Sequence, residues 1–241
     1  MTGDAATTPQ NPNAGDISAL AVWIVTSAIF LVLLALVFTY TEVLRGELGL
    51  VELGQTTILA IALALMLNVL IFHANTRWLR IWMGVVVLGT IYLLGEETSW
   101  GQHFFGWETG GFFGRINDQG ETNFHNSSGG WLDQKPRAVL LLGMILGTIV
   151  HPLVKHFRKG RGLFDNPWWF APTLASLAPV IISQLAALPK KIDGLHLLPY
   201  SLNFYRWSEM EEIFMYIFFI TYTLSLRQRL AWRKQHGVAP S

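Results

Sequence analysis

No cysteine occurs among the 241 residues, so the chain can form no disulfide, bind no metal through a thiolate and use no cysteine nucleophile. Charged residues are scarce as well, at 14% of the chain, whereas soluble domains carry about 25%. The sequence contains no P-loop, no dinucleotide-binding glycine pattern and no G-x-S-x-G motif. The net charge of +1 gives no support for a nucleic-acid partner. The low content of charged residues favours a polytopic membrane protein over a soluble domain.

Long apolar runs are what the chain has instead, and they predict an all-α polytopic membrane protein with a bundle of about six transmembrane helices. The six segments are Ile17–Tyr40, Leu53–His73, Trp78–Gly95, Ala138–Val154, Trp168–Leu188 and Ser208–Leu226. A membrane-spanning helix needs about 20 residues, which the first, second and fifth segments supply outright. We therefore expect a flexible cytoplasmic tail over residues 1–16, a six-helix domain over 17–230 with an outer motif loop over 96–136, and a cytoplasmic tail over 231–241.

Basic and acidic residues fall on opposite sides of these segments. The connections after the second, fourth and sixth segments are short and hold Arg77, Arg80, Lys155, Arg158, Lys159, Arg161, Arg227, Arg229, Arg233 and Lys234. All but Asp4, Asp16 and Asp165 of the sixteen acidic residues fall in or beside the other connections. Because Lys and Arg favour the cytoplasmic side, both termini are expected in the cytoplasm and the acid-rich connections outside.

Several carboxylates are predicted to lie at the edge of the hydrocarbon on that outer side. At about 1.5 Å per residue, Glu96 lies roughly 24 Å from Arg80, within a hydrocarbon core about 30 Å thick. Glu52 begins the second segment from the same side, and Glu209, Glu211 and Glu212 begin the sixth. Acidic side chains at this depth are costly and commonly mark a functional site. The structural alternative is that they only complement helix N-termini.

The densest polar stretch, residues 95–126, contains an acid–histidine pair, Glu121 and His125, at i,i+4 spacing. On a helix this spacing places both side chains on one face, as metal ligation requires. Carboxylate-rich sites with one or two imidazoles favour Ca, Mg, Mn or a non-haem Fe pair, and Zn with fewer ligands. The sequence therefore predicts a divalent-metal site, with candidate ligands Glu52, Glu96, Glu97, Glu121, His125, Glu209 and Glu212.

Catalytic roles are predicted for Glu97, Glu121 and Ser99 in the same stretch. A metal ion lowers the pKa of a bound water, and a spare carboxylate can then take its proton. The side chains expected to orient a substrate are Gln102, His103, Asn123 and Asn126. Whether Glu96 or Glu97 faces the bundle stays open, because adjacent helical positions diverge by about 100°.

The run EETSWGQ at Glu96–Gln102, followed by NDQGETNFHN at Asn117–Asn126, carries a resemblance. It resembles the pattern EExSWGQ…NxQGExNxHN of an uncharacterised family of bacterial polytopic inner-membrane proteins. The acids of Glu47–Glu52 and the pair Glu209 and Glu212 are also similar to those of its members. This resemblance implies a bacterial inner membrane and supplies no reaction.

Three functions follow as hypotheses. The first is a metal-dependent enzyme that acts at the outer face on a lipid or lipid-linked substrate. The second is a non-catalytic scaffold subunit of a larger membrane complex, since ten Trp and fifteen Phe offer surface for packing against other subunits. The third is an ion or solute transporter, since acids in a membrane often mark such pathways. Membrane lipids are expected partners in every case.

Overall fold

The structure is a computed structural model that describes residues 13–39, 49–117, 120–124, 131–159, 161–163, 171–202 and 207–237, without the side chains of His103 and of residues 131–135. Within these ranges the regular elements are helices. The predicted all-α class is therefore confirmed for this part of the chain. Residues 1–12 and 238–241 of the two expected tails lie outside the described residues.

Four helices are long and apolar enough to cross a membrane, which fits an integral membrane protein. They are α1 (Ala19–Thr39), α3 (Leu50–Phe72), α4 (Arg77–Glu97) and the stretch Pro136–Phe157. The last of these belongs to one longer helix in three parts, α7 (Trp131–Ile145), a π-helical turn η2 (Leu146–Val150) and α8 (His151–Phe157). It begins seven residues earlier than the apolar run at Ala138 predicts, and this brings Arg137 inside the helix.

The remaining elements are shorter, apart from the last. They are η1 (Ser99–Gly101), α5 (Gln102–Phe105), α6 (Phe113–Ile116), η4 (Leu174–Ser176), α9 (Leu177–Ala186), α10 (Leu188–Gly194) and α11 (Trp207–Gln235). The predicted fifth segment is represented by α9, whose ten residues are too few to cross the hydrocarbon, and residues 164–170 before it lie outside the description. Helix α11 has 29 residues but is less apolar than the four candidate spans. Four spans are thus supported in the described residues, and the count of six is not confirmed.

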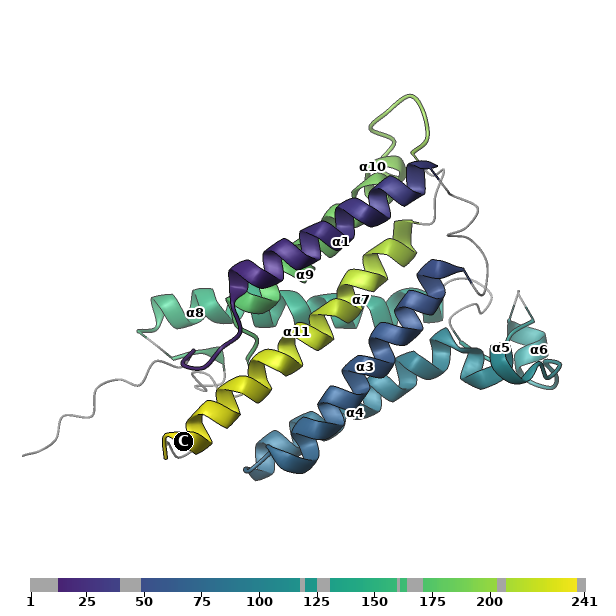
Figure 1. Ribbon diagram of the computed structural model, residues 1–241. Helices are drawn as coiled ribbons and strands as arrows, with labels where there is room; N and C mark the ends of the chain where they lie inside the picture. Colours follow the sequence, from purple (N-terminus) through teal and green to yellow (C-terminus); the bar gives the residue numbers. More distant parts are fainter. Residues whose placement is uncertain are drawn as a thin grey trace, which may run out of the picture.

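Helix α11 is the centre of the bundle, and its surroundings explain its polar composition. It packs along α3 and α9 and also touches α1 (Figure 1). Twenty of its side chains are buried, among them Glu212, Tyr216 and Arg229, whereas α1 buries only Thr26 and Val37. A helix surrounded by lipid must be apolar, while one surrounded by protein can keep polar groups that find partners there.

Apolar packing holds α3, α4 and α11 together. Leu59 and Met66 of α3, Met83 of α4 and Leu226 of α11 belong to one buried cluster and are fully enclosed. A second cluster joins α11 to α1 and α9 around Phe214, whose ring meets the edge of Phe30 at 5.8 Å. This close packing fixes the register of the helices and so the depth of their polar ends.

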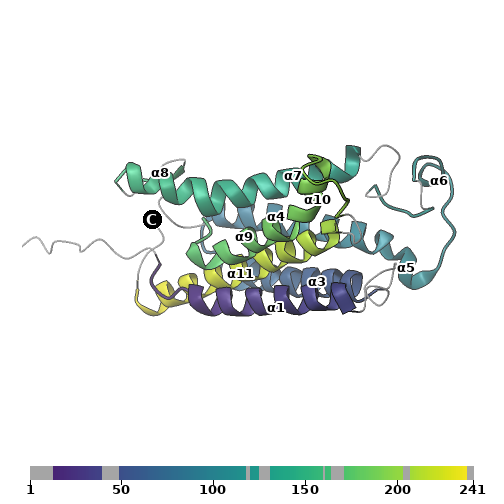
Figure 2. The ribbon, with the colours of Figure 1, turned by 90° about the horizontal axis from the view of Figure 1, so that it is seen from above.

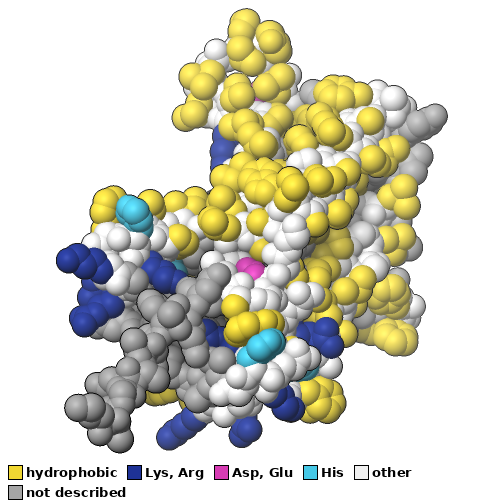
Figure 3. Space-filling model, turned by 60° about the vertical axis from the view of Figure 1, so that its left-hand side comes forward, with side chains coloured by type: hydrophobic (Ala, Val, Ile, Leu, Met, Phe, Trp, Pro, Cys, Tyr) yellow, Lys and Arg dark blue, Asp and Glu magenta, His cyan; other side chains and the backbone are white. Residues whose placement is uncertain are grey.

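The helices alternate in direction, so acids from separate segments reach one end of the bundle. We use "acidic end" for the end of the bundle that holds the starts of α3, α7 and α11, the last turn of α4, and α5, α6 and α10 (Figures 1 and 2). Lys and Arg side chains gather at the opposite end, which faces the viewer in Figure 3 and which we call the basic end. The predicted separation of charge along the bundle is present in the fold.

Candidate functional site

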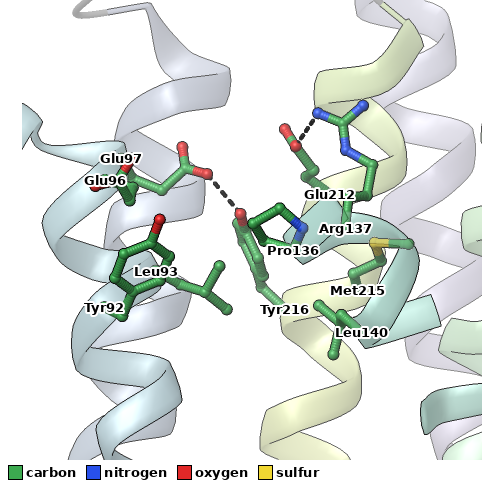
Figure 4. Close-up of a pocket in the computed structure, with 10 residues that line it drawn as sticks. All are labelled: Tyr92, Leu93, Glu96, Glu97, Pro136, Arg137, Leu140, Glu212, Met215 and Tyr216. Carbon is green, nitrogen blue, oxygen red and sulfur yellow. Dashed lines mark hydrogen bonds and ion pairs between the residues drawn. The ribbon is translucent and has the colours of Figure 1, made fainter. Parts of the chain in front are cut away.

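A pocket with about 430 Å³ of empty space lies at the acidic end between α4, α7 and α11. Its polar walls are two carboxyl groups, Glu97 and Glu212, the guanidinium of Arg137 and the hydroxyls of Tyr92 and Tyr216 (Figure 4). The remaining lining residues are Leu93, Glu96, Pro136, Leu140 and Met215. This volume includes the open space at the mouth of the pocket. Concave sites that are mostly apolar and have a few convergent polar groups are typical of small-ligand sites.

One wall of the pocket is a carboxyl–phenol pair between α4 and α11. The Tyr216 hydroxyl donates a hydrogen bond to Glu97 Oε1 at 2.5 Å (Figure 4). Glu97 is the last residue of α4, and Tyr216 lies four residues after Glu212 on α11. Residues at i,i+4 share a helix face, so α11 presents Glu212 and Tyr216 together. The pair therefore places a carboxyl group and a phenol against the same pocket.

The facing wall is an ion pair. Arg137 Nη2 of α7 contacts Glu212 Oε1, and both side chains are largely buried (Figure 4). Gln55 of α3 donates through Nε2 to Glu212 Oε2 at 3.3 Å and to the Glu209 carbonyl at 3.0 Å. A buried carboxylate needs such a cation and such donors, because an uncompensated charge in a low dielectric is costly. Arg137 thus neutralises an acid that the apolar runs bury.

Glu96 and Glu97 point in different directions, which answers the question that the sequence left open. Glu96 is buried and turns away from the bundle axis: Trp100 Nε1 donates to its Oε1 at 2.8 Å and the Phe124 amide to its Oε2 at 2.7 Å. Glu97 is left to face Tyr216. Glu96 therefore anchors the motif loop, and Glu97 serves the pocket.

Hydrogen bonds inside the loop join the polar residues of the motif to one another. The Asn123 amide donates to Glu121 Oε2 at 2.6 Å and to Ser99 Oγ at 2.8 Å, and Ser99 Oγ donates to the same carboxylate at 3.2 Å. Asn117 donates to Asn123 Oδ1 at 2.8 Å. Ser99, Glu121 and Asn123 are all buried. We call this set of four residues the buried knot.

Gln102 forms a second set of hydrogen bonds within the motif loop. Its Nε2 donates to Thr109 Oγ1 at 2.7 Å and to the Gly120 carbonyl at 3.2 Å, and its Oε1 accepts from the Thr122 amide at 2.6 Å. Thr109 Oγ1 also donates to the Gly120 carbonyl. Gln102, predicted to orient a substrate, thus uses its side-chain amide to join the segment around Thr109 to the segment around Gly120 and Thr122.

The backbone leaves the right-handed helical conformation where α4 ends. Ser99, Trp100 and Gly101 follow one another with φ of 47°, 55° and 102°, a left-handed run that L-residues other than glycine rarely adopt. Such strain persists only where surrounding contacts over-determine it. Here the bonds of Ser99 to the buried knot and of Trp100 to Glu96 supply those contacts. The left-handed run separates α4 from α5.

The other predicted site residues are distributed around these two networks. Glu52, in the first turn of α3, acts electrostatically on Glu97. Glu211 accepts from Gln184 Nε2 of α9 at 3.2 Å, and Glu209 is buried in the first turn of α11. The described residues contain no group of three His, Asp or Glu side chains placed to hold a metal ion. His125 and Asn126, with Glu42 and Glu47, lie outside the described residues, so the metal site stays a prediction.

Three pocket residues, Arg137, Tyr216 and Tyr92, were not among the predicted site residues. Tyr216 could have been found from the sequence, because it follows Glu212 by one helical turn. Arg137 follows Pro136, a residue typical of the first turn of a helix, yet the apolar run alone placed the helix start at Ala138. Tyr92 has no signal of its own in a run of apolar residues.

Comparisons with protein-family models, with curated proteins and with solved structures find no match to this chain. Function must therefore be argued from the pocket and its surroundings alone.

Proposed function

We propose that this chain is an inner-membrane enzyme of a bacterium that acts at the outer face on a lipid or lipid-linked substrate. One observation carries the proposal: the Glu97–Tyr216 pair faces the Arg137–Glu212 pair across a pocket at the acidic end. Enzymes that move protons need titratable groups side by side in a concave site, and this pocket has them.

The chemistry that this arrangement suits is general acid–base catalysis. Glu97 would exchange a proton with a hydroxyl group or a water at the substrate, while the Tyr216 hydroxyl holds the carboxyl in position. Arg137 and Glu212, fixed by each other and by Gln55, would orient the polar part of the substrate. Well-placed proton transfer of this kind contributes about 10²–10⁴ in rate.

The proposal includes an orientation, with the acidic end outside and both termini in the cytoplasm, supported by the gathering of Lys and Arg at the basic end (Figure 3). Because the chain has no cysteine, one introduced cysteine is a unique label. In intact cells a membrane-impermeant maleimide should label Leu197→Cys, in the exposed segment after α10, and should label Lys234→Cys only after permeabilisation. The opposite labelling pattern would show that the acidic end faces the cytoplasm.

The catalytic proposal is tested by lipid extracts of cells that express the wild type, Glu97→Gln or an empty vector. We expect mass spectrometry to find at least one lipid or lipid-linked species depleted by the wild type and restored to the vector level by Glu97→Gln, with a change of about 10²-fold or more in turnover. Glu108→Gln is the matched control, since Glu108 is an exposed carboxylate at the same end. Identical profiles for wild type and vector contradict the proposal.

A second candidate function is a non-catalytic subunit of a membrane complex, and one observation favours it. Phe104, Phe105 and Phe112 are more than half exposed, and Trp107 is 40% exposed, on the α5–α6 segment that projects from the acidic end (Figure 2). Such aromatic groups are typical of binding surfaces. Purification in mild detergent distinguishes the two functions, since a subunit would co-purify with a partner in fixed stoichiometry and the enzyme would not.

A further inference from the structure

The pocket lies beside lipid rather than at the aqueous mouth of a channel. Glu97 ends a helix of 21 residues, so it stands about 30 Å from Arg77, and Leu93 lies one turn deeper. Leu93 and Leu140 face each other from α4 and α7 across the pocket (Figure 4). The outward neighbours on the same helices, Leu88 and Val139, are more than two-thirds exposed, as lipid-facing residues are. The apolar part of the pocket is therefore at the depth of the lipid acyl chains.

Among the described residues, α4 packs mainly along α3, and α7 joins the same buried cluster through Met144, Leu140 and Leu141. Helix α7 contains Pro136 near its outer end and continues into the π-helical turn at residues 146–150, and both features interrupt regular helical hydrogen bonding. A ligand in the bilayer can therefore reach the pocket sideways between the two helices.

The charges in the pocket select among headgroups. Three glutamates line the pocket, Glu96, Glu97 and Glu212, and Glu52 acts electrostatically on Glu97 from nearby, whereas the pocket has one guanidinium, that of Arg137. That guanidinium already pairs with Glu212. A phosphate in the pocket would therefore lie near carboxyl groups, while the one guanidinium there is already paired. Like charges a few ångströms apart repel strongly at low dielectric. Hydroxyl and ammonium groups, by contrast, donate hydrogen bonds to carboxylates.

We propose that the pocket takes an amphiphile from the outer leaflet whose reacting headgroup is hydroxylated or carries an ammonium group, and that it discriminates against a phosphate monoester. The headgroup lies against Glu97 and Glu212, and the chain extends past Leu93 and Leu140 into the bilayer. This inference rests on the proposed function only in assuming that the pocket binds a lipid-like molecule.

The test uses the purified full chain with one introduced cysteine that carries an environment-sensitive fluorophore. Leu140→Cys places the label in the pocket wall, and Val139→Cys, one residue away, places it toward lipid as the matched control. Three amphiphiles with the same chain are titrated: dodecylamine, dodecyl glucoside and dodecyl phosphate. We expect the first two to change the fluorescence of the Leu140→Cys label at concentrations about tenfold or more below dodecyl phosphate. The Val139→Cys label should show no such preference.

A second variant tests the cause of the preference. Glu97→Gln keeps the shape of the side chain but cannot ionise beside an ammonium group. The difference between the concentrations of dodecylamine and dodecyl phosphate that change the signal should therefore narrow by about tenfold. The inference is overturned if dodecyl phosphate binds as tightly as dodecylamine, or if no amphiphile changes the signal at Leu140→Cys. Binding as expected with an unchanged cellular lipid profile would instead overturn the catalytic proposal alone.

Discussion

Replacing Arg137 by leucine is expected to lower the free energy of unfolding by about 3–5 kcal/mol, the cost of leaving a buried charge without its partner. Glu212 is only 5% exposed, and Arg137 is its cation. Once Arg137 is gone, the Gln55 amide of α3 still donates to this carboxylate, but a neutral amide compensates little of a full charge. In a chain of this size such a loss lowers the melting temperature by about 10 °C.

Thermal unfolding of the purified protein in detergent measures this effect. The double variant Arg137→Leu with Glu212→Leu should recover at least half of the lost stability, because two apolar side chains can replace a buried ion pair at little cost. Arg115→Leu is the control: Arg115 is exposed, and its loss should change stability by no more than about 0.5 kcal/mol. If the double variant is no more stable than Arg137→Leu alone, the ion pair does not hold the pocket together.

Helix positions and the separation of charge could be predicted from the sequence, because both follow from local composition. A lipid-facing helix such as α1 must be apolar throughout, and its bounds at Ala19 and Thr39 differ by two residues at one end and one at the other from the predicted segment. The central helix α11 obeys a different rule, since protein surrounds it. Composition therefore identifies it less clearly as a membrane helix.

The division of the acids between two networks could not be predicted. Glu96 and Glu97 are neighbours, and their directions depend on where α4 stops and on the left-handed run from Ser99 that follows. The sequence grouped Glu97, Glu121 and Ser99 as one catalytic set. The fold places Glu121 and Ser99 in the buried knot and Glu97 in the pocket with Tyr216. Contacts that join residues 20 to 120 positions apart have no local signal, whereas i,i+4 pairs such as Glu212 and Tyr216 do.

The buried knot leads to the second large expected effect, which is local. Asn123→Ala should raise hydrogen–deuterium exchange about 100-fold in the peptides that cover residues 99–117 and 120–124, and leave exchange in α11 unchanged. Asn123 is 1% exposed, and its amide donates to Glu121 and Ser99 and accepts from Asn117. Removing the Asn123 amide takes hydrogen-bond partners from a buried carboxylate and a buried amide. The free energy of local opening should then fall by about 3 kcal/mol, which corresponds to this change in exchange.

The matched control is Thr122→Ala, one residue away, which removes a hydroxyl that accepts from Trp107 at the surface. Its effect on exchange should stay below about fivefold, because an exposed hydrogen bond contributes little. Unchanged exchange in Asn123→Ala would mean that the motif is not what holds the loop. The expected result has a consequence for the pocket: the loop holds Glu96, and with Glu96 fixed the last turn of α4 directs Glu97 toward Tyr216. Loosening the buried knot should therefore also weaken the pocket, although Ser99, Glu121 and Asn123 do not themselves line it.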